Sequence, residues 1–323
     1  MSVAVSTGRY RALPWRLAAW GRERYPLAVA GVLAPAYLVA VLFGRALSHP
    51  GPPRPRPSDA AGFAAVWAFF LMVRILDDHK DYARDRVTHP GRLLQRGVVT
   101  LDQLKTVAVG AWAVQFAAVL AVERGPGRVG LWWLVTLGWT ALAARDFFLG
   151  TRVADRPVLY PLLHLPLSGL ACLWMAQVGA GTRALPATGL AVAALGVAVA
   201  GCVDVTRKLV PDGGGRGYAV ALGARRAAGA GALAVAIHTL VLVAVVRLGG
   251  GSVAVTAAVP LLAVAPLAAL ARYATVPVPA SASASAGTAA PAHARPARYG
   301  LVVVVPAQLA VAAAALLVGA GRW

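Results

Sequence analysis

The chain has 323 residues, of which 59% are hydrophobic and 13% are charged, and its formal net charge is +19. This apolar composition excludes an ordinary water-soluble domain. The basic residues are spread over the connections between apolar segments and form no single patch, which argues against nucleic acid as a partner. We therefore expect an all-helical protein of the lipid bilayer.

Apolar windows of about 20 residues, the length that crosses a bilayer, predict a polytopic bundle of nine transmembrane helices. A basic lead, residues 1–24, precedes one membrane domain, residues 25–323, and a low-complexity Ala/Ser/Pro linker, residues 274–297, comes before the last helix. The predicted helices cover roughly residues 25–43, 60–77, 104–122, 129–148, 157–178, 185–204, 227–247, 252–272 and 299–320.

The distribution of Lys and Arg predicts the orientation of the bundle. Most of the 31 basic residues lie in the N-terminal lead and in every second connection after it. By the positive-inside rule these segments are cytoplasmic, so we expect a cytoplasmic N-terminus and an outside C-terminus.

Four of the 12 acidic residues lie close together directly behind the apolar run 63–76; they are Asp77, Asp78, Asp81 and Asp85. Carboxylates at the end of a membrane helix are costly to place there and indicate a function by default. A helix continuing through them would present Asp78, Asp81 and Asp85 on one face. Three aligned carboxylates repel one another unless a cation neutralises them, and Mg²⁺ prefers such hard oxygen ligands.

A second charged segment follows the sixth predicted helix and contains Asp204, Arg207 and Lys208. Asp204 and Lys208 are one helical turn apart, so a simple ion pair between them is one interpretation. The other is that Asp204 binds a metal ion while Arg207 and Lys208 contact phosphate oxygens. Both predicted connections lie on the same side of the membrane, which suggests two halves of one site.

The pattern Asp77-Asp78-x-x-Asp81-x-x-x-Asp85, followed by Arg92 and Gly97, resembles the first signature of the UbiA superfamily of intramembrane prenyltransferases. The number of helices and the place of the second charged segment agree with this resemblance over nearly the whole chain. The second segment departs from the family pattern, because Lys208 stands where a further carboxylate is common.

The resemblance implies a helical bundle around a lipid-open central cavity, in which Mg²⁺ holds the diphosphate of an isoprenoid and an acceptor captures the allylic cation. It implies Asp78, Asp81 and Asp85 as the catalytic carboxylates. The implied metal ligands are Asp77, Asp78, Asp81, Asp85 and Asp204, and the implied diphosphate contacts are Lys80, Arg92, Arg207 and Lys208.

Three further polar residues, Asp146, Tyr160 and His164, are candidates for acceptor positioning or proton removal, although a histidine in an apolar helix is often only hydrogen-bonded to a neighbour. The function expected first is a Mg²⁺-dependent prenyltransferase with an unidentified acceptor. A terpene cyclase acting on an isoprenoid diphosphate is the alternative on the same scaffold. A divalent-cation transporter or permease is the alternative from another class.

Overall fold

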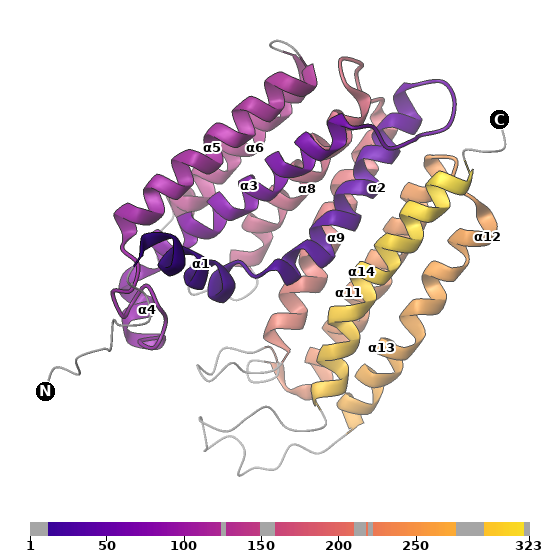
Figure 1. The fold of residues 1–323 in the computed structure, drawn as a ribbon. Helices are drawn as coiled ribbons and strands as arrows, with labels where there is room; N and C mark the ends of the chain where they lie inside the picture. Colours follow the sequence, from indigo (N-terminus) through magenta and orange to yellow (C-terminus); the bar gives the residue numbers. More distant parts are fainter. Residues whose placement is uncertain are drawn as a thin grey trace, which may run out of the picture.

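The computed structural model describes residues 12–123, 127–148, 159–209, 218, 222–275 and 294–319, without the side chains of 159–161, 206–207 and 294–301. These residues are helical or lie in turns (Figure 1). The long helices are α2 (Ala30–Ser48), α3 (Ser58–Lys80), α5 (Leu101–Glu123), α6 (Arg128–Ala144), α8 (Leu159–Ala180), α9 (Ala191–Lys208), α11 (Ala224–Leu248), α13 (Ala258–Thr275) and α14 (Ala294–Gly319). The short ones are α1 (Leu13–Arg24), η2 (Leu27–Val29), α4 (Tyr82–Thr88), η3 (Asp146–Phe148), η4 (Ala187–Leu190) and α12 (Val253–Thr256).

Eight segments of the described chain are long and apolar enough to cross a membrane, which makes this an integral, multi-pass membrane protein. The fourth predicted span, residues 129–148, is not among these eight, and its helix is shorter than expected. Its helix α6 ends after 17 residues at Ala144, because Asp146, Phe147 and Phe148 take left-handed backbone conformations. Seventeen residues lie at the lower end of the length that spans a bilayer. Most of the predicted linker, residues 276–293, lies outside the described residues.

The long helices form a closed ring in chain order. Each one packs against the next, and α14 returns to α2 (Figure 1). Helix α4, the end of α6, where Asp146 pairs with Lys80, and the last turn of α9 lie at one end of the bundle, while the turn between α2 and α3 lies at the other. The two charged segments predicted to share a side of the membrane therefore do share an end of the bundle.

Helices α2 and α8 cross through the ring with their backbones in contact. A Cβ atom at Gly44 would lie 1.9 Å from the carbonyl oxygen of Ala176, and one at Gly179 would lie 2.0 Å from that of Val41. Small residues allow this approach in membrane bundles, where close van der Waals packing holds helices together. The lipid-open central cavity stays a prediction.

Helix α1, which lies within the predicted basic lead of residues 1–24, packs against the rest of the described chain. Its Trp20 is buried with Ile75, Leu94, Val99 and Leu104, so the helix is packed onto the end of α3, the connection that follows and the start of α5. Burial of a tryptophan of this kind contributes substantially to docking, since aromatic side chains remove a large apolar area from water. Residues 1–11 lie outside the described part of the chain.

Candidate active site

The first aspartate motif, which contains Asp77, Asp78, Asp81 and Asp85, lies where one helix ends and the next begins. Helix α3 ends at Lys80 and α4 begins at Tyr82, with Asp81 between them at φ −89° and ψ 2°. The predicted continuous helix through the motif is therefore interrupted at Asp81. The four carboxylates consequently meet different surroundings.

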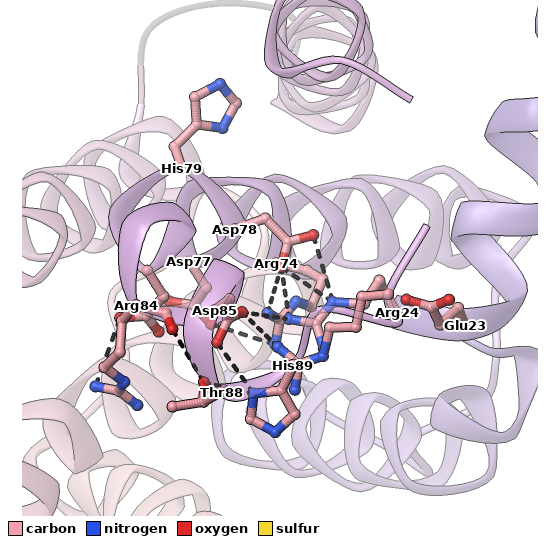
Figure 2. Close-up of polar contacts among 12 residues, drawn as sticks. Glu23, Arg24, Arg74, Asp77, Asp78, His79, Arg84, Asp85, Thr88 and His89 are labelled. Carbon is pink, nitrogen blue, oxygen red and sulfur yellow. Dashed lines mark hydrogen bonds and ion pairs between the residues drawn. The ribbon is translucent and has the colours of Figure 1, made fainter. Parts of the chain in front are cut away.

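Asp78 is buried, with 2% of its surface exposed, and three side chains donate hydrogen bonds to it. Arg24 Nε and Nη2 approach Oδ1 to 3.0 and 2.6 Å, Arg74 Nη2 approaches Oδ1 to 2.6 Å, and Trp20 Nε1 approaches Oδ2 to 2.9 Å. Figure 2 shows Arg24 and Arg74 meeting at this carboxylate. The contact of Arg74 is the one that spacing of four residues along α3 predicts.

Asp85 is the second buried carboxylate of the motif, with 5% of its surface exposed. Arg92 Nη1 donates a hydrogen bond to Oδ2, and His89 Nδ1 lies 3.4 Å from Oδ1. Arg24 Nη2 lies 3.9 Å from Oδ2, so this one guanidinium reaches both buried carboxylates. Burial lowers the pKa of Arg92, and the positive charge of Arg24 lowers it further, while Asp85 opposes the shift. Three guanidinium groups are therefore crowded around Asp78 and Asp85.

Asp77 and Asp81 are more accessible. Their side chains are 49% and 31% exposed, and the cations paired with them are Arg74 and Arg84, each at 3.8 Å. These two carboxylates thus lie at the surface of the motif and make only long contacts. They are not gathered with Asp78 and Asp85 around a common point.

Helix α1 also holds the connection that follows α4. Glu23 accepts hydrogen bonds from the backbone N–H of Leu93 at 3.2 and 3.3 Å. Trp20, Glu23 and Arg24 were not among the predicted site residues. The signal that was available is an acidic residue and a tryptophan within a basic segment of helical length.

An open groove of about 320 Å³ borders this cluster between α1, α3 and α5. Apart from Arg22 its side chains are mostly apolar or aromatic, and those that line its wall include Leu17, Tyr25, Trp67, Leu71 and Val107. A groove of this chemistry next to charged groups suits an amphiphilic ligand, whose apolar part avoids water there.

Lys80 connects the motif to another predicted residue, Asp146, through an ion pair of 2.5 Å. Asp146 begins the left-handed turn η3, in which Phe147 packs edge-on against both Trp139 and His164. Asp146 therefore lies beside the first motif, and His164 contacts the same turn through Phe147; a role of either residue in acceptor binding stays a prediction. The side chain of Tyr160 lies outside the described residues.

The second charged segment forms a separate cluster. Lys208 Nζ lies 2.7 Å from Asp204 Oδ1, and Tyr218 donates a hydrogen bond of 2.8 Å to Asp204 Oδ2. The simple ion pair left open by the sequence is thus confirmed. Burial and the charge of Asp204 raise the pKa of Tyr218, which keeps its hydroxyl protonated. Tyr218 stands in a glycine-rich segment and carried no signal in the sequence; the side chain of Arg207 lies outside the described residues.

The carboxylates do not fit a magnesium ion as they lie. Within the described ranges, no three Asp, Glu, His or Cys side chains are arranged to hold a metal ion. Asp78 and Asp85 are each already neutralised by guanidinium groups, and the described contacts of Asp204 are with Lys208 and Tyr218. The predicted set of five metal ligands, Asp77, Asp78, Asp81, Asp85 and Asp204, is therefore not assembled.

No protein-family model and no curated protein sequence matches this chain. A solved structure of digeranylgeranylglyceryl phosphate synthase in membranes is similar to it, with a TM-score of 0.56 and 11% sequence identity. The likeness covers 95% of this chain and 99% of that one. That synthase is an intramembrane prenyltransferase of the UbiA superfamily. The chain thus has the fold of this synthase over nearly its whole length, which is the fold that the resemblance in sequence predicted.

Proposed function

We propose that this protein is an intramembrane prenyltransferase, which takes an isoprenoid diphosphate and transfers its prenyl group to an acceptor not yet identified. The observation that carries the proposal is the arginine-rich cluster at the end of α3, placed within a fold that matches a prenyl-transferring synthase over its whole length. Arginine presents planar pairs of N–H donors that match phosphate oxygens.

The cluster supports binding of the diphosphate. Arg74 Nε is buried and has no hydrogen-bond partner among the described residues, so a donor is left over for an anion. Lys80, at the end of the same helix, adds a further cation beside Asp146. When the bond to the prenyl carbon breaks, negative charge grows on the leaving diphosphate, and fixed cations in a partly buried site stabilise that charge.

The apolar side chains around the cluster support binding of the prenyl group and exclusion of water from it. The groove beside Trp20 is lined mainly by apolar and aromatic side chains, and it adjoins the residues that hold Asp78. Deeper along α3, Phe69 and Trp174 are buried against each other with ring centres 5.8 Å apart. An apolar wall excludes water from an allylic cation, and aromatic faces attract a positive charge.

The proposed acceptor side is the turn after α6. There Asp146 is held by Lys80, and His164 packs against Phe147, so an acceptor hydroxyl could be positioned between the charged cluster and the start of α8. A neutral imidazole is a suitable base near pH 7. We propose no step through a magnesium ion, because the carboxylates as they lie do not fit one.

The test uses the purified full-length protein in liposomes, supplied with allylic isoprenoid diphosphates of increasing chain length and a total lipid extract. Diphosphate release and new lipids are measured by mass spectrometry. We expect a prenylated lipid. We also expect Arg92→Gln to lower kcat/KM about a hundredfold, as loss of one charged donor to a developing anion does.

Arg86→Gln is the matched control, because Arg86 is exposed on α4 and should leave turnover unchanged. Size-exclusion chromatography and helix content establish that each variant is folded. A cyclic product formed without any acceptor would identify a terpene cyclase instead of a transferase. Absence of diphosphate release with every chain length would overturn the proposal.

A further inference from the structure

We infer that the guanidinium group of Arg24 takes the place of a divalent metal ion at the first aspartate motif, so that the native protein holds Asp78 and Asp85 together with a cation of its own chain. The inference concerns which cation the motif contains. It is tested without substrate, so its outcome is separate from that of the proposed function.

The geometry of Arg24 is that of a bridge. Its Nε and Nη2 atoms bind Asp78 Oδ1 at 3.0 and 2.6 Å, and the same Nη2 lies 3.9 Å from Asp85 Oδ2. Asp78 and Asp85 lie on either side of the break at Asp81, on two different helices. A positive group between two carboxylates from neighbouring helices does what a bridging metal ion would do there.

Because these groups are buried, the motif can hold either the Arg24 guanidinium or a metal ion, but not both. Asp78 and Asp85 are almost entirely buried, and the side chain of Arg24 is only 12% exposed. A buried carboxylate must be compensated by charge and hydrogen bonds, and Arg24, Arg74 and Trp20 supply both to Asp78. A metal ion entering here would have to break these charge-assisted bonds and lie beside buried guanidinium groups of the same sign.

Arg24 is fixed in this position by the rest of α1. Trp20, one turn earlier, is buried and donates its own hydrogen bond to Asp78 at 2.9 Å. Glu23 accepts the N–H of Leu93 on the far side of the motif. The guanidinium is thus carried by a docked helix with three separate contacts to the motif, unlike a mobile surface arginine.

Removing Arg24 should turn the motif into a metal site. The four carboxylates Asp77, Asp78, Asp81 and Asp85 would keep the partners Trp20, Arg74, Arg84, Arg92 and His89, but the buried pair Asp78 and Asp85 would lose the cation between them. Carboxylates that lose their cation attract Mg²⁺ or Mn²⁺, which accept hard oxygen ligands.

The experiment measures Mn²⁺ binding by electron paramagnetic resonance on the purified full-length protein in lipid nanodiscs. We expect Arg24→Gln to bind Mn²⁺ about tenfold or more tightly than the wild type, as removal of one nearby like charge predicts. Arg22→Gln is the matched control. It removes the same charge from an exposed position on the same helix and should bind as weakly as the wild type. Mg²⁺ should displace the bound Mn²⁺.

The double variant Arg24→Gln/Asp78→Asn should lose the gained affinity, which assigns the new site to the motif. Arg24→Lys keeps the charge but not the paired donors, and should gain less than Arg24→Gln; it serves if the glutamine variant does not fold. Tight Mn²⁺ binding by the wild type that Asp78→Asn abolishes would overturn the inference. So would a folded Arg24→Gln protein whose Mn²⁺ affinity equals that of the wild type.

Discussion

Two buried aspartates stand at opposite ends of α3, and each forms an ion pair with arginine. Asp78 is held by Arg24 and Arg74, while Asp59 is held by Arg45, whose Nη2 and Nη1 lie 2.7 and 3.1 Å from its two oxygens. The backbone N–H of Arg56 donates a further hydrogen bond to Asp59 at 2.7 Å. Asp78 belongs to the candidate site and Asp59 does not. A substitution of Asp59 therefore measures what a buried Arg–Asp pair contributes to stability alone.

Asp59→Ala should destabilise the protein by about 3 kcal/mol, because Arg45 would keep its buried charge without its partner. Asp102→Ala is the matched control. Asp102 pairs with Lys105 at the surface, and its loss should cost less than about 1 kcal/mol. The free energy of unfolding is compared by denaturant titration in detergent micelles. Equal stability of the two variants would contradict the structural role of the Arg45–Asp59 pair.

At the scale of the helices, the decisive contact is the crossing of α2 and α8. Gly44 and Gly179 let the two backbones touch, and around them the core holds Val41, Phe43 and Trp174 without exposure. The crossing divides the ring into two groups of helices. It also sets the position of α3 along the bundle, because Phe69 of α3 packs on Trp174 of α8.

Gly44→Ala should therefore lower the melting temperature, because the added Cβ would meet the Ala176 carbonyl at 1.9 Å and force the helices apart. Overpacking of this kind costs roughly 1–3 kcal/mol. Gly110→Ala, on the open face of α5 where a Cβ meets nothing within 4 Å, should be neutral or slightly stabilising. A melting temperature of Gly44→Ala at or above that of Gly110→Ala would show that the crossing is looser than described.

At the scale of the whole molecule, the two charged segments share one end of the bundle. The ends of α3 and α9, with their Arg, Lys and Asp residues, emerge there, and the Arg45–Asp59 pair lies at the opposite end. The sequence predicts that the first of these ends is cytoplasmic, since most basic residues flank it.

Two exposed alanines test this orientation. Ala83 lies on α4 beside the motif, and Ala60 lies at the start of α3. In intact cells a membrane-impermeant maleimide should label Ala60→Cys and should label Ala83→Cys only after the membrane is opened. The native Cys172 and Cys202 are buried and give a low background. Labelling of Ala83→Cys from outside would reverse the predicted orientation.

The parts of the structure that follow from local spacing were predictable from the sequence. Apolar windows located the helices, and the spacing of four residues identified the pair Asp204–Lys208. What escaped prediction depends on contacts between distant parts of the chain. Arg24 meets Asp78 across 54 residues, and Lys80 meets Asp146 on another helix. A row of carboxylates predicts that a cation is needed, but its spacing does not tell whether a metal ion or a folded-back arginine supplies it.

The contact between Glu23 and Leu93 gives the protein an internal reporter. The amide of Leu93 donates its hydrogen bond to a side chain on α1 and not to its own helix or turn. Its hydrogen will exchange with deuterated solvent whenever α1 leaves the motif, while the amides inside α3 remain protected by their helix. The exchange rate of the Leu93 amide, compared with the rates of neighbouring amides, therefore measures how often α1 separates from the motif.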